Sequence, residues 1–217
     1  MRLGYHLSIA KGFAAAVDEA VSLDATALQL LSHNPSTWRM KEIPAAAAAE
    51  FRERVRASPL EAVVVHTMYL LNLASPDDDL YEKSVAVLIE EVERAGRLGV
   101  DLLVTHLGSQ RGSGAEKGLA RIASALDRVV ASGPLRRHRR LTLLLENTAG
   151  AGSSVGGDFA ELGETLRSLR SPDRVGVCLD TCHAFAYGYE PRSRSASQGP
   201  FGTSNARSAS RASPSST

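Results

Sequence analysis

Four short apolar runs in this chain each end in a residue that can bind a metal ion. Runs of Val and Leu this long are typical of strands buried on both faces, as in a parallel sheet covered by helices. The pattern therefore predicts an α/β fold. The runs and the residues that follow them are 63–65 with His66, 102–105 with His106, 143–145 with Glu146, and 175–179 with Asp180 and then His183.

Segments with apolar residues at helical spacing separate these runs, so predicted strands and helices alternate along the chain. Between residues 77 and 98, for example, Val85, Leu88 and Val92 fall on one stripe of a helix. We expect strands at 3–7, 27–31, 62–65, 102–104, 141–145 and 175–179, and helices at 12–23, 44–57, 77–98, 116–132 and 158–170.

Two architectures are built from such units, an open doubly wound sheet and a closed (β/α)₈ barrel. In an open sheet ligands gather near one switch point, whereas in a barrel the carboxyl end of every strand points at one central cleft. Metal-binding residue types at the ends of four successive strands favour the TIM-barrel type, with only six strands evident and the last two βα units missing. No Gly-x-Gly-x-x-Gly or Walker motif follows a strand, so no motif supports a nucleotide cofactor.

Composition indicates one globular domain, residues 1–190, followed by a different kind of segment. The 217 residues are 43% hydrophobic, which is enough for a substantial core. The formal net charge of +1 argues against a protein that coats nucleic acid by bulk electrostatics, although a local basic cleft stays possible.

The two cysteines, Cys178 and Cys182, lie four residues apart and do not form a disulfide framework. We expect buried, reduced thiols and a cytoplasmic location. The start of the chain has no apolar stretch of signal-peptide length, and no run approaches the length that spans a bilayer, so no membrane partner is expected.

Residues 191–217 break the alternating pattern. They contain nine Ser and four Arg among 27 residues and no Asp or Glu, so they have almost nothing to bury, and we expect disorder. One interpretation is a basic arm that binds nucleic acid; the favoured one is a tail without an evolved role. The abrupt onset suggests the hypothesis of a non-native reading frame after about residue 190.

His and carboxylate side chains past strand ends suit a zinc-like divalent ion. Asp180 and His183 alone are weak support, because a helix-capping Asp beside a surface His gives the same pattern. Recurrence at three upstream strand ends strengthens the metal interpretation. A carboxylate such as Glu146 has two oxygens and can bridge two ions, whereas a neutral imidazole fills a terminal position without adding charge.

Five blocks of the sequence resemble the endonuclease IV family of apurinic/apyrimidinic DNA repair enzymes. The resemblance implies a (β/α)₈ barrel with three zinc ions that cuts the phosphodiester 5′ to an abasic site and leaves a 3′-hydroxyl, as part of base excision repair. The blocks are GYHLSIAKG near the start, VHTMYLLNL at 65–73, VTHLGS at 104–109, LLENTAGAGSSVG at 144–156 and RVGVCLDTCHAFAYGY at 174–189.

Carried over residue by residue, the resemblance implies the metal centre. His66 and His106 are expected zinc ligands, and Glu146 is expected to bridge two zincs and to be the catalytic residue. Asp180 and His183 are expected to bind a neighbouring zinc. Zinc makes water acidic near neutral pH and neutralises phosphate charge, so no side-chain nucleophile is needed.

The resemblance also implies DNA contacts. Tyr69 and Leu70 are expected to enter the helix at the lesion, although a loop anchor packing on the barrel rim is the alternative. Asn34, Trp38 and Arg39 are expected to contact DNA by hydrogen bonds, stacking and phosphate binding, against the alternative of an ordinary structured loop.

The other histidines receive smaller roles. His6 ends the first strand and is expected to support the ligands from the edge of the cleft, unless it is an ordinary hydrogen-bonded rim histidine. His33 and His138 are predicted to lie in solvated loops. The four arginines around His138 are predicted to form a solvated patch at the opposite end of the barrel; they are Arg136, Arg137, Arg139 and Arg140.

The family pattern continues with two more strands that carry a further His, an Asp-x-His pair and a Glu. Residues 191–217 contain none of these residue types, so at most five ligands are present. We expect fewer than three zincs, reduced stability from unpaired sheet edges, and weak or absent nuclease activity.

The expected partner is double-stranded DNA containing abasic sites, acted on by a monomer. One alternative is a sugar isomerase/epimerase-like barrel that uses one divalent metal. Another is an inactive, truncated remnant that binds DNA or metal without cleavage.

Overall fold

The computed structural model describes residues 1–190, and the expectations for residues 191–217 lie outside the described part. Its centre is one parallel sheet in which the six strands follow one another in sequence order, β1 to β6. This order is that of successive strands in a TIM-type barrel and confirms the predicted fold class. The strands are β1 (Gly4–His6), β2 (Ala27–Leu31), β3 (Ala62–His66), β4 (Leu102–Thr105), β5 (Thr142–Glu146) and β6 (Val175–Cys178).

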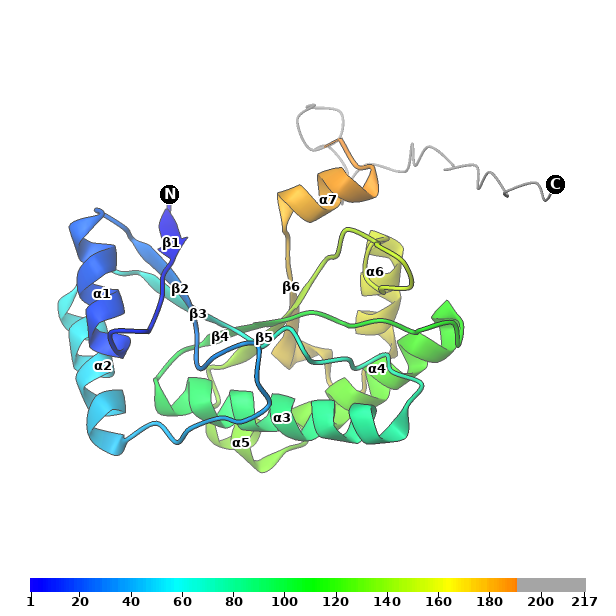
Figure 1. Cartoon of the computed structure of the whole chain (residues 1–217), viewed down its shortest axis with the longest axis horizontal. Helices are drawn as coiled ribbons and strands as arrows, with labels where there is room; N and C mark the ends of the chain where they lie inside the picture. Colours follow the sequence, from blue (N-terminus) through cyan, green and yellow to red (C-terminus); the bar gives the residue numbers. More distant parts are fainter. Residues whose placement is uncertain (191–217) are drawn as a thin grey trace.

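Helices cover the outer side of the curved sheet, and β1 and β6 lie at its two ends (Figure 1). Neighbouring helices pack in pairs, α1 on α2, α3 on α5 and α4 on α6. The helices are α1 (Phe13–Ser22), α2 (Ala45–Ala57), α3 (Asp78–Arg97), α4 (Ala115–Val130), α5 (Gly133–Arg137), α6 (Phe159–Ser168) and α7 (Thr181–Tyr187), with a 3₁₀ turn, η1 (Pro172–Arg174).

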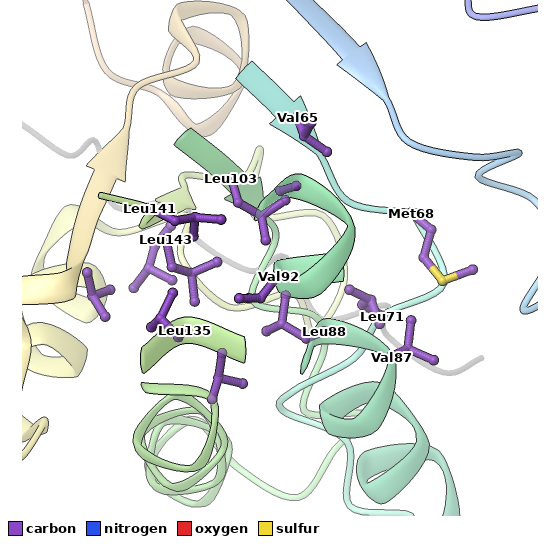
Figure 2. Packing of buried hydrophobic residues seen from close by; sticks show 14 of the residues in the cluster. Val65, Met68, Leu71, Val87, Leu88, Val92, Leu103, Leu135, Leu141 and Leu143 are labelled. Carbon is purple, nitrogen blue, oxygen red and sulfur yellow. The ribbon is translucent and has the colours of Figure 1, made fainter. Parts of the chain in front are cut away.

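The long helix α3 shows how the sequence builds this outer layer. Its N-cap is Asp77, whose carboxylate accepts a hydrogen bond from the backbone N–H of Leu80 and satisfies one of the free donors of the first turn. The apolar stripe predicted from the sequence is buried, and Figure 2 shows Leu88 and Val92 gathered with Leu103 of β4. Packing of this stripe against the sheet fixes the carboxyl ends of the central strands.

Most predicted boundaries agree with the structure to within two residues, but two short helices were not expected. Residues 133–137 form α5, whose first turn is capped by the side chain of Ser132. Residues 181–187 form α7, so Cys182 and His183 lie in a helix that follows the last predicted strand. Within residues 1–190, no helix has both the length and the apolar character needed to cross a bilayer.

Candidate metal centre

The carboxyl ends of β3, β4, β5 and β6 bring the five predicted ligands to one place. His66 and Glu146 are the last residues of β3 and β5, and His106 follows β4 directly. Asp180 is the N-cap of α7, and His183 lies in the first turn of that helix. Parallel strands end at the same edge of a sheet, so residues far apart in sequence meet there.

Glu146 lies at the centre of this group. Its Oε2 is 2.7 Å from Nε2 of His66 and 3.6 Å from Nε2 of His106. Its Oε1 is 3.5 Å from Nδ1 of His183. One oxygen of the carboxylate therefore faces each side of the group, which is the orientation that a bridging ligand needs.

Two sets of three residues are arranged to hold an ion. One is His66, His106 and Glu146; the other is Glu146, Asp180 and His183; in each set the ligand atoms lie within 4.8 Å of one another. Ligand atoms about 2.0–2.1 Å from a tetrahedral zinc lie about 3.3 Å apart. Nε2 of His106 and Oε2 of Glu146, 3.6 Å apart, are close to that spacing, so the first set fits the metal. In the second set, the ring of His183 lies beside Oε1 of Glu146 and Oδ2 of Asp180.

Hydrogen bonds outside the ligands orient His66. Its Nδ1–H donates to the carbonyl oxygen of Thr67 at 2.8 Å, since a carbonyl only accepts. The hydroxyl of Thr67 donates in turn to that of Thr105 at 3.1 Å. This arrangement directs Nε2 of His66 at Glu146, in the way that carbonyl partners orient metal-binding histidines.

The two histidines beside Glu146 differ in their electrostatics. Burial opposes protonation of His66, but its hydrogen bonds to Glu146 and Thr67, together with nearby negative charge, outweigh burial and raise its pKa. Burial lowers the pKa of His106, and the neighbouring histidines add to this while Glu146 opposes it. A neutral His106 has the free lone pair that a metal ligand requires.

Tyr69 and Leu70 lie on the surface directly after β3, with 62% and 36% of their area exposed. The ring centroid of Tyr69 is 6.4 Å from that of His66, so this side chain borders the metal centre. Met68 and Leu71 on either side are buried. The loop is thus anchored at both ends and presents its two middle residues to solvent.

The loop after β2 is occupied by internal contacts. Asn34 accepts a hydrogen bond from the backbone N–H of Ser36 at 2.9 Å. Trp38 packs against the core, and Nζ of Lys83 lies 4.3 Å from its ring centroid. Arg39 is exposed. Trp38 therefore anchors the loop to the core. Arg39 stays on the surface.

His6 lies at the end of β1, where its Nδ1 is 3.1 Å from the side-chain nitrogen of Gln29 on β2. Partial burial lowers the pKa of His6, and the charge of His66 adds to the effect. His6 therefore interacts electrostatically with His66, but it belongs to neither set of three ligands.

Two histidines predicted to lie in solvated loops pack against α3 instead, and His138 keeps 25% of its side chain exposed. His33 has 7% of its side chain exposed and donates from Nε2 to Glu91 at 2.8 Å. The ring of His138 lies against Gly96, with its Nε2 3.5 Å from Glu93. The prediction was wrong because the partners, Glu91 and Glu93, lie on α3, far from His33 and His138 in the sequence. Local sequence patterns do not indicate such long-range pairs.

The remaining predictions concern the cysteines and the basic patch. Both cysteines are free; Cys178 is half-buried, and burial raises the pKa of its thiol. Cys182 is exposed, so its predicted burial was wrong. In the basic patch, Arg137 forms an ion pair with Glu93, and Arg140 forms one with Asp101.

Comparisons with known proteins identify the family of this chain. The model of the xylose isomerase-like TIM barrel family matches residues 17–205. A protein named probable endonuclease 4 from Cenarchaeum symbiosum is 47% identical over 203 residues, which are 93% of this chain and 71% of that relative. The chain belongs to the endonuclease IV family.

Solved structures support both the family and the fold. The crystal structure of endonuclease IV from Thermus thermophilus is 41% identical, with a TM-score of 0.74, covering 87% of this chain and 66% of that one. D-psicose 3-epimerase matches with a TM-score of 0.68 at 14% identity, over 88% of this chain and 67% of its own, which shows a shared fold alone. The chain spans about two thirds of the length of its endonuclease IV relatives.

Proposed function

We propose that this chain binds zinc at His66, His106, Glu146, Asp180 and His183 and hydrolyses the phosphodiester 5′ to an abasic site, leaving a 3′-hydroxyl. The observation that carries the proposal is the position of Glu146, whose two oxygens face two different sets of ligands. A bridged pair of ions is suited to hydrolysis of a phosphodiester, because both the attacking and the leaving oxygen can be stabilised.

The protein supplies binding and orientation in this reaction. Zinc, when bound, supplies Lewis acidity that makes water acidic near neutral pH and neutralises phosphate charge. His66 and His106 bind without adding charge, and the carbonyl of Thr67 holds His66 in one tautomer. Glu146 contributes the negative charge that two adjacent cations require.

Recognition of the substrate is proposed to come from the exposed residues beside the centre. Tyr69 and Leu70 present apolar bulk at the border of the metal centre, where it can enter the gap left by a missing base. Arg39 can contact phosphate. The proposed substrate is therefore double-stranded DNA with abasic sites, acted on by a monomer in the cytoplasm.

The number of ions follows from the ligand sets. The described residues supply two sets of three that share Glu146, so we propose up to two zincs from this part of the chain. A cluster of three needs further ligands. Cleavage is therefore expected to be weaker than that of the Thermus thermophilus relative.

A duplex oligonucleotide with a single abasic site tests the proposal. Purified chain should nick the abasic strand on its 5′ side in the presence of zinc, and the Glu146→Gln variant should lose this activity. A panel of ketoses serves as the comparison, because the epimerase-like alternative predicts sugar turnover. Zinc-independent cleavage, or turnover of a ketose without DNA cleavage, would contradict the proposal.

A further inference from the structure

Asn147 lies directly after Glu146, and its side chain is fully buried beside the second set of ligands. Its backbone N–H donates to the carbonyl of Cys178 at 3.4 Å, which extends the pairing of β5 with β6 by one bond. The side chain then continues that pairing toward Asp180. This residue lies in one of the sequence blocks that carry the family resemblance, but no role of its own was predicted for it.

The amide of Asn147 makes two hydrogen bonds with the backbone of Asp180. Its Oδ1 accepts from the N–H of Asp180 at 2.7 Å, and its Nδ2 donates to the carbonyl of Asp180 at 3.0 Å. The planar side-chain amide of Asn147 thus pairs with both the backbone N–H and the backbone carbonyl of Asp180. Aspartate lacks the donor, and glutamine is one methylene longer.

The backbone carbonyl of Asn147 holds the other ligand. It accepts a hydrogen bond from Nδ1 of His183 at 2.9 Å, which assigns the hydrogen to Nδ1 and leaves the lone pair on Nε2. Asp180 is fixed again through its own side chain, because Oδ1 accepts from the N–H of His183 at 2.8 Å. Its Oδ2 stays directed toward the ring of His183, 3.6 Å from Nδ1.

We propose that Asn147 is a positioning residue that sets Asp180 and His183 in register with Glu146, and so forms the second ion site. The inference rests on the zinc binding proposed above. Three hydrogen bonds from one residue connect Glu146, its sequence neighbour, to two ligands more than thirty residues away. The first set, His66 with His106 and Glu146, makes no hydrogen bond to the Asn147 side chain within the described residues.

Zinc titration of metal-free protein tests the inference with three variants. Asn147→Ala removes the amide, and Asn147→Leu removes it while filling the same space. Asn72→Ala is the matched control: Asn72 is also buried, and its Oδ1 accepts from the N–H groups of Ala74 and Ser109, but it touches no ligand.

Loss of a supporting hydrogen bond weakens metal binding by roughly 10- to 100-fold. Both Asn147 variants should therefore bind one zinc equivalent that much more weakly, whereas Asn72→Ala should bind zinc like the wild type even where its melting temperature falls. Wild-type zinc affinity in the Asn147 variants overturns the inference, as does equal weakening in Asn72→Ala or recovery of binding in Asn147→Leu.

A measurement on the wild type covers the case in which the Asn147 variants do not fold. Nitrogen-15 NMR of the metal-free protein should show His183 with its hydrogen on Nδ1, and a hydrogen on Nε2 overturns the inference. Wild-type protein that takes up no zinc overturns it too. Zinc uptake with the expected variant effects but without abasic-site cleavage contradicts only the proposed function.

Discussion

At the scale of single residues, Glu91 is a fully buried carboxylate on α3 that belongs to neither proposed ligand set. It accepts hydrogen bonds from the hydroxyl of Ser32 and from His33, each at 2.8 Å. Arg94 donates to the hydroxyl and carbonyl of Ser32 and to the carbonyl of Lys41. These bonds fasten the loop after β2 to the helix.

Removing the Glu91 carboxylate should destabilise the protein strongly. Glu91→Ala leaves His33 and the hydroxyl of Ser32 without their buried acceptor, and it removes a negative charge that favours the buried Arg94. Each buried donor left unsatisfied costs about 1–3 kcal/mol of unfolding free energy. Urea denaturation measures the loss. The control is Glu90→Ala, because Glu90 is the exposed neighbour and its replacement should change stability by about 0.5 kcal/mol or less. Similar losses for both variants would show that the network contributes little.

Asp180 is both a proposed zinc ligand and the N-cap of α7, and substitutions can separate these two roles. Asp180→Asn keeps a side-chain oxygen that can cap α7, so zinc binding should fall while metal-free stability stays nearly unchanged. Asp180→Ala loses both roles and should cost about 1 kcal/mol more. Zinc titration and thermal denaturation of metal-free protein measure the two effects. Equal stability of the two variants would show that the cap is unimportant.

Some of these polar residues could be predicted from the sequence and others could not. The grouping of the five proposed ligands was predictable, because they follow apolar strands and parallel strands end together. Asn147 and Glu91 were not, because their burial depends on partners that the chain brings from distant positions. A charged residue on a helix usually faces solvent, and nothing local to Glu91 indicates otherwise.

At the scale of elements, the loop after β3 has buried residues at its ends and exposed residues in its middle. Met68 and Leu71 fix its ends in the core, while Tyr69 and Leu70 face solvent. The sequence predicted this exposed pair through its resemblance to a family. It did not predict α7, although a helix-capping Asp180 was weighed as the alternative to a metal ligand; the structure shows the capping bond from the N–H of His183.

Tyr69→Ala should weaken binding to abasic duplex without affecting the fold. Stacking of an aromatic side chain on a base contributes about 1–3 kcal/mol, which corresponds to roughly 5- to 150-fold in affinity. Fluorescence anisotropy with abasic and intact duplexes measures the change. Met68→Ala is the contrasting variant and should lose about 2–5 kcal/mol of stability because its side chain is buried. Unchanged affinity for abasic duplex in Tyr69→Ala would contradict the wedge role.

At the scale of the whole molecule, the sheet of six strands places every proposed ligand at or just after the carboxyl ends of β3 to β6. The fold class followed from the regular alternation of strand and helix patterns, and the order of the strands confirms it. The five ligands come from three strand ends and from the helix that follows the last strand, so ion binding connects β3, β4, β5 and α7.

Zinc should therefore stabilise the whole fold. Free zinc at 100 times its Kd adds about 2.7 kcal/mol, which for a domain of this size is roughly 5–10 °C in Tm. Thermal denaturation with zinc and with a chelator measures the shift. His66→Ala disrupts the first ligand set only and should lose part of the shift, whereas Cys182→Ser should keep it, because Cys182 is exposed and belongs to neither ligand set. A full shift in His66→Ala would contradict this assignment.

The most direct measurement is anomalous diffraction at the zinc absorption edge from crystals grown with zinc. We expect one peak between His66, His106 and Glu146 and a second between Glu146, Asp180 and His183, with the Glu146 carboxylate bridging them. Crystals with no anomalous peak at Glu146 would contradict the account.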